Sequence, residues 1–397
     1  MESKYLIVLG AGPQQALVYK CANKIGIKTL AIDYNPDAVS FSNASDYIVA
    51  QIKNPKECIN ALKKKQLTYG GIIGYGIELS PVVSSIAKEF NLVSVPEEVA
   101  LQTTNKCVRS RILKEKKIPI PKFEIITSFD KPEIKLPFVV KPSDNSGSRG
   151  VRLVKSINEW KSAYEEALSF SSDGRVIVEE YLNGQEISIE GFIINGKLII
   201  YGFTDRNFIR DEKYYPYFVE DGSSCPTKLS SSMVSEVNQA FSNAVDALNI
   251  NNGPSKGDLI VTKEGVKVLE ITSRISPGFS LFMPYSAGVD PLTATIKWTL
   301  GEKVRASDFK PRFQKGMAHR YYFHNTGKII SITGFTDVIN MDGVIKVIKL
   351  QNFEIGDTLD PVSYINRLFY IITIGQTREQ AIMYAERALK SVTIKVE

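Results

Sequence analysis

The sequence is poor in the residue types that build thiolate metal sites, disulfide frameworks and histidine-dependent catalysis. Its 397 residues include four cysteines and two histidines, His319 and His324. The cysteines are scattered and form no CxxC pair, so neither a zinc site nor a disulfide framework is expected. The sequence also shows no Ser/His/Asp or Cys/His pattern of the kind that marks a protein nucleophile. A reaction that depends on a protein nucleophile is therefore not expected.

Long apolar runs and blocks of like charge are lacking as well. No apolar run approaches the roughly 20 residues of a membrane span, and residues 1–4 lead into a strand without the basic and apolar regions of a signal peptide. The formal net charge of +6 is mild for this length, and the lysines are not concentrated in one block. The sequence therefore predicts a cytoplasmic protein with no membrane partner and no nucleic-acid partner.

The chain begins with alternating strands and helices, and its length predicts two or three domains. Residues 5–9 form an apolar strand that ends in the glycine turn Gly10–Gly12, and a helix and a second strand ending at Asp33 follow. This unit predicts a parallel sheet. It also fits part of a dinucleotide fingerprint, but Gln15 stands where the third glycine would be. NAD binding is therefore a weak alternative.

A second glycine turn, Gly74–Gly76, follows a later strand of the same domain, which ends near residue 95. Ligands in open α/β sheets gather at the carboxyl ends of the strands. Glu78, which comes just after this turn, is therefore a candidate for a substrate pocket. The alternative is a solvated carboxylate at the start of the next helix.

The segment Lys141–Gly150 combines two cations with serine and glycine between two apolar runs, residues 136–140 and 151–154. The two runs predict a hairpin, and the small residues let backbone amides approach an anion closely. Lys141 at the end of the first strand and Arg149 inside the loop supply positive charge. We expect a loop that closes over phosphates, with a solvated hairpin turn as the alternative.

Several carboxylates occur at the ends of strands or within them farther along the chain. Glu179 and Glu180 end an apolar strand, and Glu186 begins the next one. Asp258 and Glu270 lie on two strands joined by a turn, at a spacing that lets both face one side of the sheet. Two converging carboxylates are unfavourable without a cation between them, and oxygen ligands favour magnesium over zinc. Taken singly, each carboxylate fits an exposed surface charge equally well.

Residues 204–229 show no clear periodicity and are rich in aromatic and charged side chains, which is typical of a long functional loop. The composition changes again from about residue 301. The pattern there predicts strands near residues 319–323, 328–333, 344–349 and 369–373, a helix at 378–389 and a last strand at 392–396. These elements predict a small α+β domain.

In their order and spacing, these segments resemble the ATP-grasp superfamily over nearly the whole chain. The residues that carry the resemblance are Lys106, the Lys141–Gly150 loop, Glu179 to Leu182 with Glu186, Asp258, and Glu270 to Arg274. Within the superfamily the chain is similar to biotin carboxylase, the large subunit of carbamoyl-phosphate synthetase and the amino-acid ligases.

The resemblance implies a multi-domain protein of α/β and α+β class with an ATP-grasp fold. It places an N-terminal Rossmann-like domain at residues 1–103 and an ATP-grasp domain at 104–303, with a lid at about 120–183. A small C-terminal α+β domain would occupy residues 304–397. The resemblance also implies a homodimer.

The resemblance further implies that ATP is bound, with its phosphates near the Lys141–Gly150 loop. Lys106 and Lys141 would pair with the α- and β-phosphates. The loop would close over the β/γ end through Ser146, Gly147 and Ser148.

The adenosine part of ATP would lie where the lid meets the rest of the ATP-grasp domain. Glu180 and Leu182 would hold the adenine through backbone groups, and Glu179 would contact the adenine amino group. Glu186 would accept hydrogen bonds from the ribose hydroxyls.

Asp258, Glu270 and Thr272 are the metal ligands that the resemblance implies, for Mg²⁺ with Mn²⁺ as an alternative. Many relatives read Glu-x-Asn-Pro-Arg where this chain has Glu270 to Arg274. A threonine hydroxyl is a poorer magnesium ligand than an amide carbonyl, so we expect a weaker second metal position. Arg274 would stabilise the acyl-phosphate and the tetrahedral intermediate, and it is predicted to be catalytic together with Lys141.

The implied reaction is an ATP-dependent ligation of a small carboxylate to an amine. The carboxylate attacks the γ-phosphate, ADP leaves, and the amine displaces phosphate to form an amide. Substrate-side candidates are Glu78, Glu220, Ser276 and Gly278, with Glu220 holding the amine as its ammonium. The alternatives are a bicarbonate- or formate-activating enzyme of the same superfamily and an ATP-binding subunit without turnover.

Overall fold

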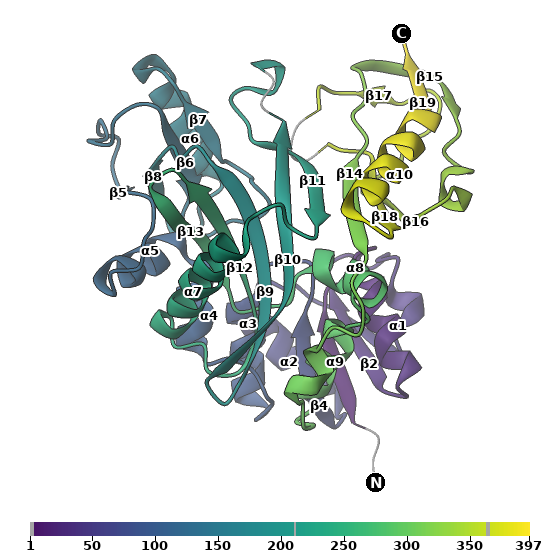
Figure 1. Cartoon of the computed structure of the whole chain (residues 1–397). Helices are drawn as coiled ribbons and strands as arrows, with labels where there is room; N and C mark the ends of the chain where they lie inside the picture. Colours follow the sequence, from purple (N-terminus) through teal and green to yellow (C-terminus); the bar gives the residue numbers. More distant parts are fainter. Residues whose placement is uncertain (1–3, 210–211, 363–365) are drawn as a thin grey trace.

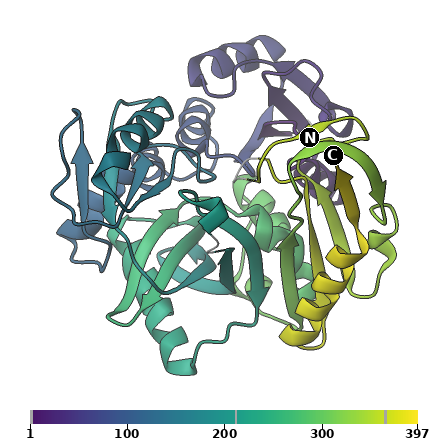
Figure 2. The ribbon, with the colours of Figure 1, turned by 90° about the horizontal axis from the view of Figure 1, so that it is seen from above.

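Four β-sheets organise the described part of the chain, which in this computed structural model comprises residues 4–209, 212–362 and 366–397. In the view of Figure 1, a lid lies on one side of the middle strands of a long central sheet and the C-terminal part on the other, and the N-terminal sheet lies below them. Seen from above, the lid and the C-terminal part lie on opposite sides of the central strands (Figure 2). No helix among the described residues is long and apolar enough to cross a membrane.

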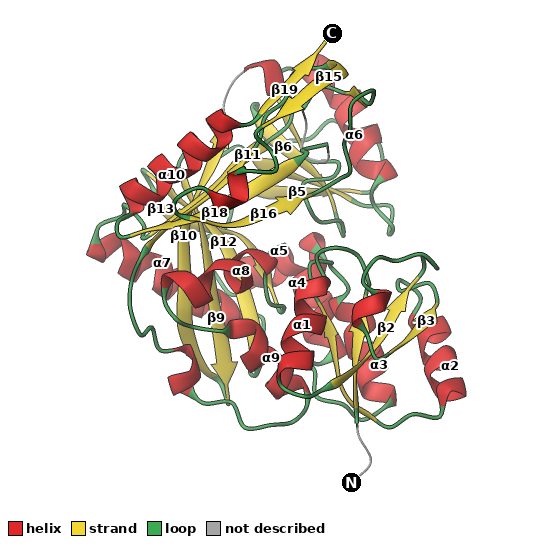
Figure 3. Ribbon diagram, turned by 90° about the vertical axis from the view of Figure 1, so that its right-hand side faces the viewer, coloured by secondary structure: helices red, strands yellow, loops and turns green. Residues whose placement is uncertain are grey.

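The N-terminal sheet is parallel, as the alternating pattern predicts, with strand order β3-β2-β1-β4. Its strands are β1 (Tyr5–Leu9), β2 (Lys28–Asp33), β3 (Asp46–Val49) and β4 (Tyr69–Gly74). Helices α2 (Pro55–Lys65) and α3 (Ser80–Glu89) pack on one face, and α1 (Ala16–Lys24) packs on the other (Figure 3). Helices α4 (Glu97–Thr104) and α5 (Lys106–Glu115) then lead to the lid.

The lid is a four-stranded antiparallel sheet with one helix, α6 (Trp160–Ser169). Its strands, in the spatial order β5-β8-β6-β7, are β5 (Phe123–Ile126), β8 (Val176–Glu180), β6 (Phe138–Pro142) and β7 (Arg152–Val154). Strands β6 and β7 pair antiparallel on either side of the Ser143–Val151 connection. The hairpin predicted around Lys141–Gly150 is therefore confirmed.

The central sheet has eight strands in the order β13-β12-β9-β10-β11-β14-β18-β16. Its first five strands are β13 (Gly265–Thr272), β12 (Gly253–Thr262), β9 (Gln185–Ile194), β10 (Lys197–Ile209) and β11 (Val219–Cys225). Ile187 and Ile189 pack with helix α7 (Ser231–Ala247) in a buried apolar cluster. Because strand side chains alternate, Glu186 and Ser188 face the opposite side, where the lid lies.

Helices α8 (Pro277–Ser286) and α9 (Pro291–Thr299) connect the central sheet back to the N-terminal sheet. Leu292 and Ile296 of α9 pack in one cluster with residues of β1 and α1. A Cβ atom on Gly71 of β4 would lie 2.6 Å from the Thr299 carbonyl oxygen, so only glycine allows this close approach.

The C-terminal part completes the central sheet instead of forming an isolated unit. It supplies β14 (Gly316–Tyr321), β18 (Phe369–Gly375) and β16 (Val344–Lys349) to that sheet. Helix α10 (Arg378–Ser391) packs against β14 and β18, and a small sheet adds β15 (Gly327–Thr333), β17 (Thr358–Leu359) and β19 (Thr393–Val396).

The predicted mixture of a parallel α/β unit with antiparallel units is confirmed. One expectation was wrong, because half of residues 204–229 belong to strands β10 and β11, so the segment is not one irregular loop. Their pairing shifts register between Asn207 and Phe208, and this bulge breaks the alternation that would have predicted strands. Residues 210–211 of that segment lie outside the described part of the chain.

Candidate active site

A cavity of about 990 Å³ lies between the lid, the central sheet and the start of helix α5. Most of the predicted site residues line it. They are Glu78, Lys106, Lys141, Ser146, Gly147, Ser148, Glu179, Glu180, Leu182, Glu186, Glu220, Asp258, Glu270 and Arg274. These residues are up to about two hundred positions apart in sequence, and the fold brings them to one space.

Three predicted residues, Thr272, Ser276 and Gly278, are not among those that line this cavity. Thr272 is 2% exposed, and its hydroxyl donates to the Lys256 carbonyl oxygen on the neighbouring strand at 3.5 Å. Ser276 caps helix α8, since its hydroxyl accepts the Phe279 N–H, and Gly278 lies in the first turn of the same helix. Ser276 and Gly278 therefore belong to the start of helix α8 and not to the cavity. The Thr272 hydroxyl is directed at the backbone of β12.

The loop between β6 and β7 has a left-handed backbone at three positions. Gly147, Ser148 and Gly150 have φ angles of +68°, +60° and +71°, a region that favours glycine. The loop is anchored on the lid, because the Asn145 side-chain amide donates to the Phe170 carbonyl at 3.0 Å. Arg149 is exposed and donates to Asn145 and Ser146 of the loop itself.

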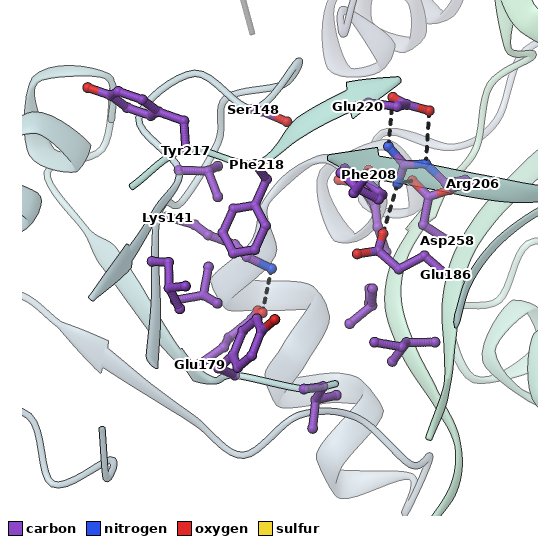
Figure 4. A pocket seen from close by; sticks show the side chains of 18 of the residues that line it. Lys141, Ser148, Glu179, Glu186, Arg206, Phe208, Tyr217, Phe218, Glu220 and Asp258 are labelled. Carbon is purple, nitrogen blue, oxygen red and sulfur yellow. Dashed lines mark hydrogen bonds and ion pairs between the residues drawn. The ribbon is translucent and has the colours of Figure 1, made fainter. Parts of the chain in front are cut away.

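Lys106 and Lys141 bring two cations to this loop. The Lys106 ammonium donates to the Asn145 carbonyl, and the Lys106 backbone N–H donates to the Ser143 carbonyl at 2.7 Å. Burial lowers the pKa of Lys106 to about 8, and the neighbouring Arg109 and Lys141 act in the same direction. Lys141 is paired with the Glu179 carboxylate (Figure 4).

Apolar side chains from the lid and the central sheet also line the cavity. They are Val139, Leu153, Leu182, Ile260 and Leu269. Glu180 lines the cavity as well, and its carboxylate accepts the Lys122 N–H and the Lys267 ammonium, each at 2.9 Å. Apolar side chains such as these suit an aromatic ring, and the Glu180 side chain is already satisfied by protein partners.

Arg206 on β10 lies at the centre of a carboxylate cluster (Figure 4). Its guanidinium lies 3.3 Å from Glu186, 3.3 Å from Asp258 and 3.1 Å from Glu220. Burial raises the pKa of Glu186 even though Arg206 opposes the shift. Burial also opposes ionisation of Glu220, but Arg206 outweighs it and lowers the pKa of that carboxyl.

Asp258 and Glu270 are directly opposed in the β12–β13 pairing, so the expectation that they share a face is confirmed. The Ser188 hydroxyl donates to Asp258 at 2.5 Å, and the Lys256 ammonium donates to its other oxygen. Burial opposes ionisation of Asp258, but Lys256 and Arg206 prevail and hold its pKa below the ordinary range.

The oxygen donors around Asp258 and Glu270 suit a magnesium ion only in part. Two carboxylates on one face fit a hard cation, whereas Thr272 offers no oxygen to the cavity. Among the described residues, no group of three or more His, Cys, Asp or Glu side chains is arranged to hold a metal. Asp258 and Glu270 therefore fit a cation that a bound phosphate would help to coordinate.

An ion pair between the central sheet and the N-terminal domain also lines the cavity. Arg274 Nε donates to Glu78 Oε2 at 2.6 Å. Ser80 and Thr104 donate to the other Glu78 oxygen at 2.9 and 3.3 Å. Arg367, just before β18, also lines the cavity and stacks over the Tyr321 ring at 3.7 Å.

Five cations that line the cavity were not predicted from the sequence: Arg109, Lys155, Arg206, Lys256 and Arg367. For two of them, the spacing in the sequence could have predicted a place in the site. Arg109 is one helical turn after Lys106, and Lys256 is two positions before Asp258 on the same strand face. Arg206 and Arg367 become recognisable only from the order of strands in the sheet.

The first glycine turn is occupied by side chains of the protein. Asp33 accepts the Ala11 N–H at 2.7 Å, and Gln15 accepts the Gly12 N–H at 3.0 Å. Neither Gly10 nor Gly12 is among the residues that line the cavity. The groups that a dinucleotide would need at this turn are thus engaged within the protein, which disfavours the NAD alternative.

Sequence comparison identifies the class to which this fold and site correspond. Residues 134–278 match the family model of the ATP-grasp domain, so the chain contains an ATP-grasp domain. The resemblance drawn from the sequence is confirmed.

Individual relatives are distant. The uncharacterized protein y4rH of Sinorhizobium fredii is 24% identical over 339 residues, which cover 83% of this chain and 68% of that protein. The D-alanine–D-alanine ligase of Francisella tularensis subsp. novicida is 26% identical over 291 residues, which cover 70% of this chain and 90% of the ligase.

Solved structures extend the likeness to the whole chain. The L-amino acid ligase from Bacillus licheniformis has a TM-score of 0.86 at 17% identity, and the match covers 100% of both chains. The biotin carboxylase domain of the Hydrogenobacter thermophilus 2-oxoglutarate carboxylase, solved with MgADP and bicarbonate, has a TM-score of 0.73 at 17% identity. That match covers 100% of this chain and 91% of the other. At these identities the matches establish the shared fold.

Proposed function

We propose that this protein is an ATP-dependent ligase that activates a small carboxylate as an acyl-phosphate and joins it to an amine. The observation that carries the proposal is the set of groups that line one cavity. They are apolar side chains, the 146–148 loop with Lys106 and Lys141, the opposed carboxylates Asp258 and Glu270, and Arg274. These are the kinds of group that adenine, phosphates with a metal ion, and an attacking carboxylate require. The ligases and the carboxylase domain that share the fold agree with this assignment.

The nucleotide is held by groups on both sides of the cavity. Adenine packs against the apolar side chains that line the cavity, Glu186 binds the ribose, and Lys106 and Lys141 neutralise the α- and β-phosphates. Residues 146–148 close over the β/γ end. Magnesium bound at Asp258 and Glu270 supplies charge neutralisation for the phosphates.

The reaction takes place at the γ-phosphate end of the cavity. A substrate carboxylate oxygen attacks the γ-phosphorus, the bond to the β-phosphate oxygen breaks, and ADP leaves. Arg274, oriented by Glu78 at 2.6 Å, binds the acyl-phosphate and stabilises the oxyanion formed when the amine attacks. The amine attacks after its ammonium has lost a proton to solvent, and the nitrogen gives up a second proton as phosphate leaves and the amide is formed.

The amine is expected to bind on the β11 side of the γ-phosphate. Glu220 is the candidate acceptor for its ammonium, although its carboxylate also binds Arg206 at 3.1 Å. An alanine at Glu220 should therefore raise the KM for the amine more than the KM for ATP. The homodimer and the cytoplasmic location expected from the sequence form part of this proposal.

A phosphate-release screen of acid and amine pairs, with ADP distinguished from AMP, tests the proposed reaction. We expect ADP and phosphate only when a suitable acid and amine are both present. Release of AMP would overturn the acyl-phosphate route. ADP release with bicarbonate or formate alone would favour the activating enzymes of the same superfamily.

The Lys141→Met variant tests the proposed phosphate site by loss of function. We expect it to lose most ADP formation, because it removes a cation from the phosphate loop. The Lys53→Met variant, at an exposed position that does not line the cavity, is the control and should retain activity. Equal activity of the two variants would contradict the assignment of the phosphate site.

A further inference from the structure

The paired strands β12 and β13 carry two carboxylates where the resemblance to the superfamily implies more than one magnesium ion. Asp258 and Glu270 are direct partners in the pairing and both line the cavity. Their surroundings determine how many divalent cations the pair can hold. Three features of those surroundings point to fewer than two.

The first feature is the orientation of Thr272. This residue follows Glu270 by two positions and stands where relatives carry an asparagine. Its hydroxyl donates to the Lys256 carbonyl at 3.5 Å, and the residue is only 2% exposed. The hydroxyl of Thr272, the third predicted metal ligand after Asp258 and Glu270, is therefore directed at the protein backbone and not at the cavity.

The second feature is a lysine next to the first carboxylate. Lys256 and Asp258 are two positions apart on one strand, so their side chains share a face. The Lys256 ammonium donates to one Asp258 oxygen, and the Ser188 hydroxyl donates to the other at 2.5 Å. Both oxygens of this carboxylate have protein donors, and one donor carries a full positive charge.

The third feature is the presence of two arginines anchored on other elements. Arg206 of β10 lies 3.3 Å from Asp258, and Arg109 of α5 lies 3.7 Å from Glu270. The Arg109 side chain is 3% exposed and also donates to the Thr103 carbonyl at 3.1 Å, so its position is fixed by the protein. Three side-chain cations therefore share the space around two carboxylates.

We propose that this protein binds one divalent cation together with ATP, and that the Lys256 ammonium takes the position and the charge role of a second one. Glu270 is the principal protein ligand of the single cation, and Asp258 is shared between it and Lys256. A lysine ammonium is a compact point charge, so it can neutralise a phosphate oxygen as a cation does. The inference rests on the proposed function only in that it requires ATP to bind in this cavity.

Counting bound Mn²⁺ by electron paramagnetic resonance tests this proposal without any turnover. The protein is saturated with a non-hydrolysable ATP analogue, whose binding is measured separately by calorimetry, and is titrated with Mn²⁺. We expect one Mn²⁺ per nucleotide-loaded chain. Two Mn²⁺ with intact nucleotide binding would overturn this inference alone, whereas failure to bind the nucleotide would contradict the proposed function as well.

Variants at Lys256 and Thr272 test whether these residues determine how many Mn²⁺ ions the protein binds. The Lys256→Gln variant and the double variant Lys256→Gln/Thr272→Asn should bind a second Mn²⁺, the double variant more tightly. Thr272 is buried, so its substitution can disturb the packing around it. The single Lys256→Gln variant avoids this disturbance and is therefore the more direct test. The control Lys53→Gln should keep one Mn²⁺. A count of one in both test variants would contradict the assigned role of Lys256.

Discussion

Lys106 is a cation held in a place that disfavours positive charge. It is buried, it is the first residue of helix α5, and two other cations lie nearby. The amino end of a helix carries partial positive charge, so a lysine there is unfavourable until an anion binds. Burial lowers the pKa of Lys106 to about 8, close to the pH of the cell. The same features that destabilise the charged lysine make this a strong place for a phosphate.

The pH dependence of ATP use follows from this shift. The lowered pKa means that the charged form is present below about pH 8 and is lost as the pH rises through that value. We expect kcat/KM for ATP to fall above pH 8, by on the order of tenfold per pH unit if only charged Lys106 binds phosphate. The Lys106→Arg variant should show no such fall up to about pH 9.5, since a guanidinium stays protonated. A wild-type profile identical to that of Lys106→Arg would contradict the assignment, and Lys53→Arg is the matched control.

Between strands β10 and β11, residues 212–218 form a strap that crosses from the central sheet to the lid. The Pro216 carbonyl accepts the Leu153 N–H at 2.9 Å, and the Tyr215 hydroxyl donates to Glu159 at 2.6 Å. Lys155 of the lid pairs with Glu212 at 2.7 Å and lies 4.5 Å from the centre of the Tyr215 ring. These contacts hold the lid against the central sheet at the cavity, which Lys155, Tyr215 and Pro216 also line.

The Tyr215→Phe variant should loosen this closure while keeping the ring in place. Loss of one hydrogen bond to a partly exposed carboxylate is worth about 1 kcal/mol, so we expect the KM for ATP to rise by roughly three- to tenfold. Release of ADP, followed by stopped-flow with a fluorescent analogue, should become faster. The control is Tyr34→Phe, at an exposed position of the N-terminal domain. Unchanged ADP release in Tyr215→Phe would show that the strap does not restrain the lid.

The sequence predicted those parts of the site that depend on local order. The β6–β7 hairpin and the opposed Asp258 and Glu270 follow from alternation and turn chemistry, which act over a few residues. Arg206 could not be predicted in its role, because its three carboxylate partners come from β9, β11 and β12. The Arg274–Glu78 pair likewise joins residues 196 positions apart, and no local pattern encodes that contact.

For the whole molecule, the central sheet is the element that joins the ATP-grasp strands to the C-terminal part. Strand β11 pairs with β14, so the sheet continues without a break from β13, which carries Glu270, to β16 at its other edge. A buried ion pair adds to this connection. Arg378 of α10 lies 2.9 Å from Asp205 of β10, and their side chains are 8% and 4% exposed.

The Asp205–Arg378 pair is well supported by neutral donors and acceptors. Asp205 also accepts the Thr227 hydroxyl at 2.5 Å and the Lys228 N–H at 3.0 Å, and Arg378 donates to the Ser224 carbonyl at 3.2 Å. Asp205 is the neighbour of Arg206 on the same strand. Removal of the Arg378 side chain is therefore expected to strain β10, the strand whose Arg206 holds the carboxylate cluster together.

The Arg378→Met variant tests whether the C-terminal helix stabilises the central sheet. Breaking a buried ion pair leaves Asp205 uncompensated and costs about 3–5 kcal/mol, which should appear as a large fall in the urea midpoint of unfolding. The matched control on the same helix is Arg387→Met, whose pair with Asp342 is 49% and 78% exposed. Such a pair is worth less than about 1 kcal/mol, so the control should unfold almost as the wild type does. Equal effects of the two substitutions would mean that the C-terminal part is held by apolar packing alone, and that the buried pair contributes no stability of its own.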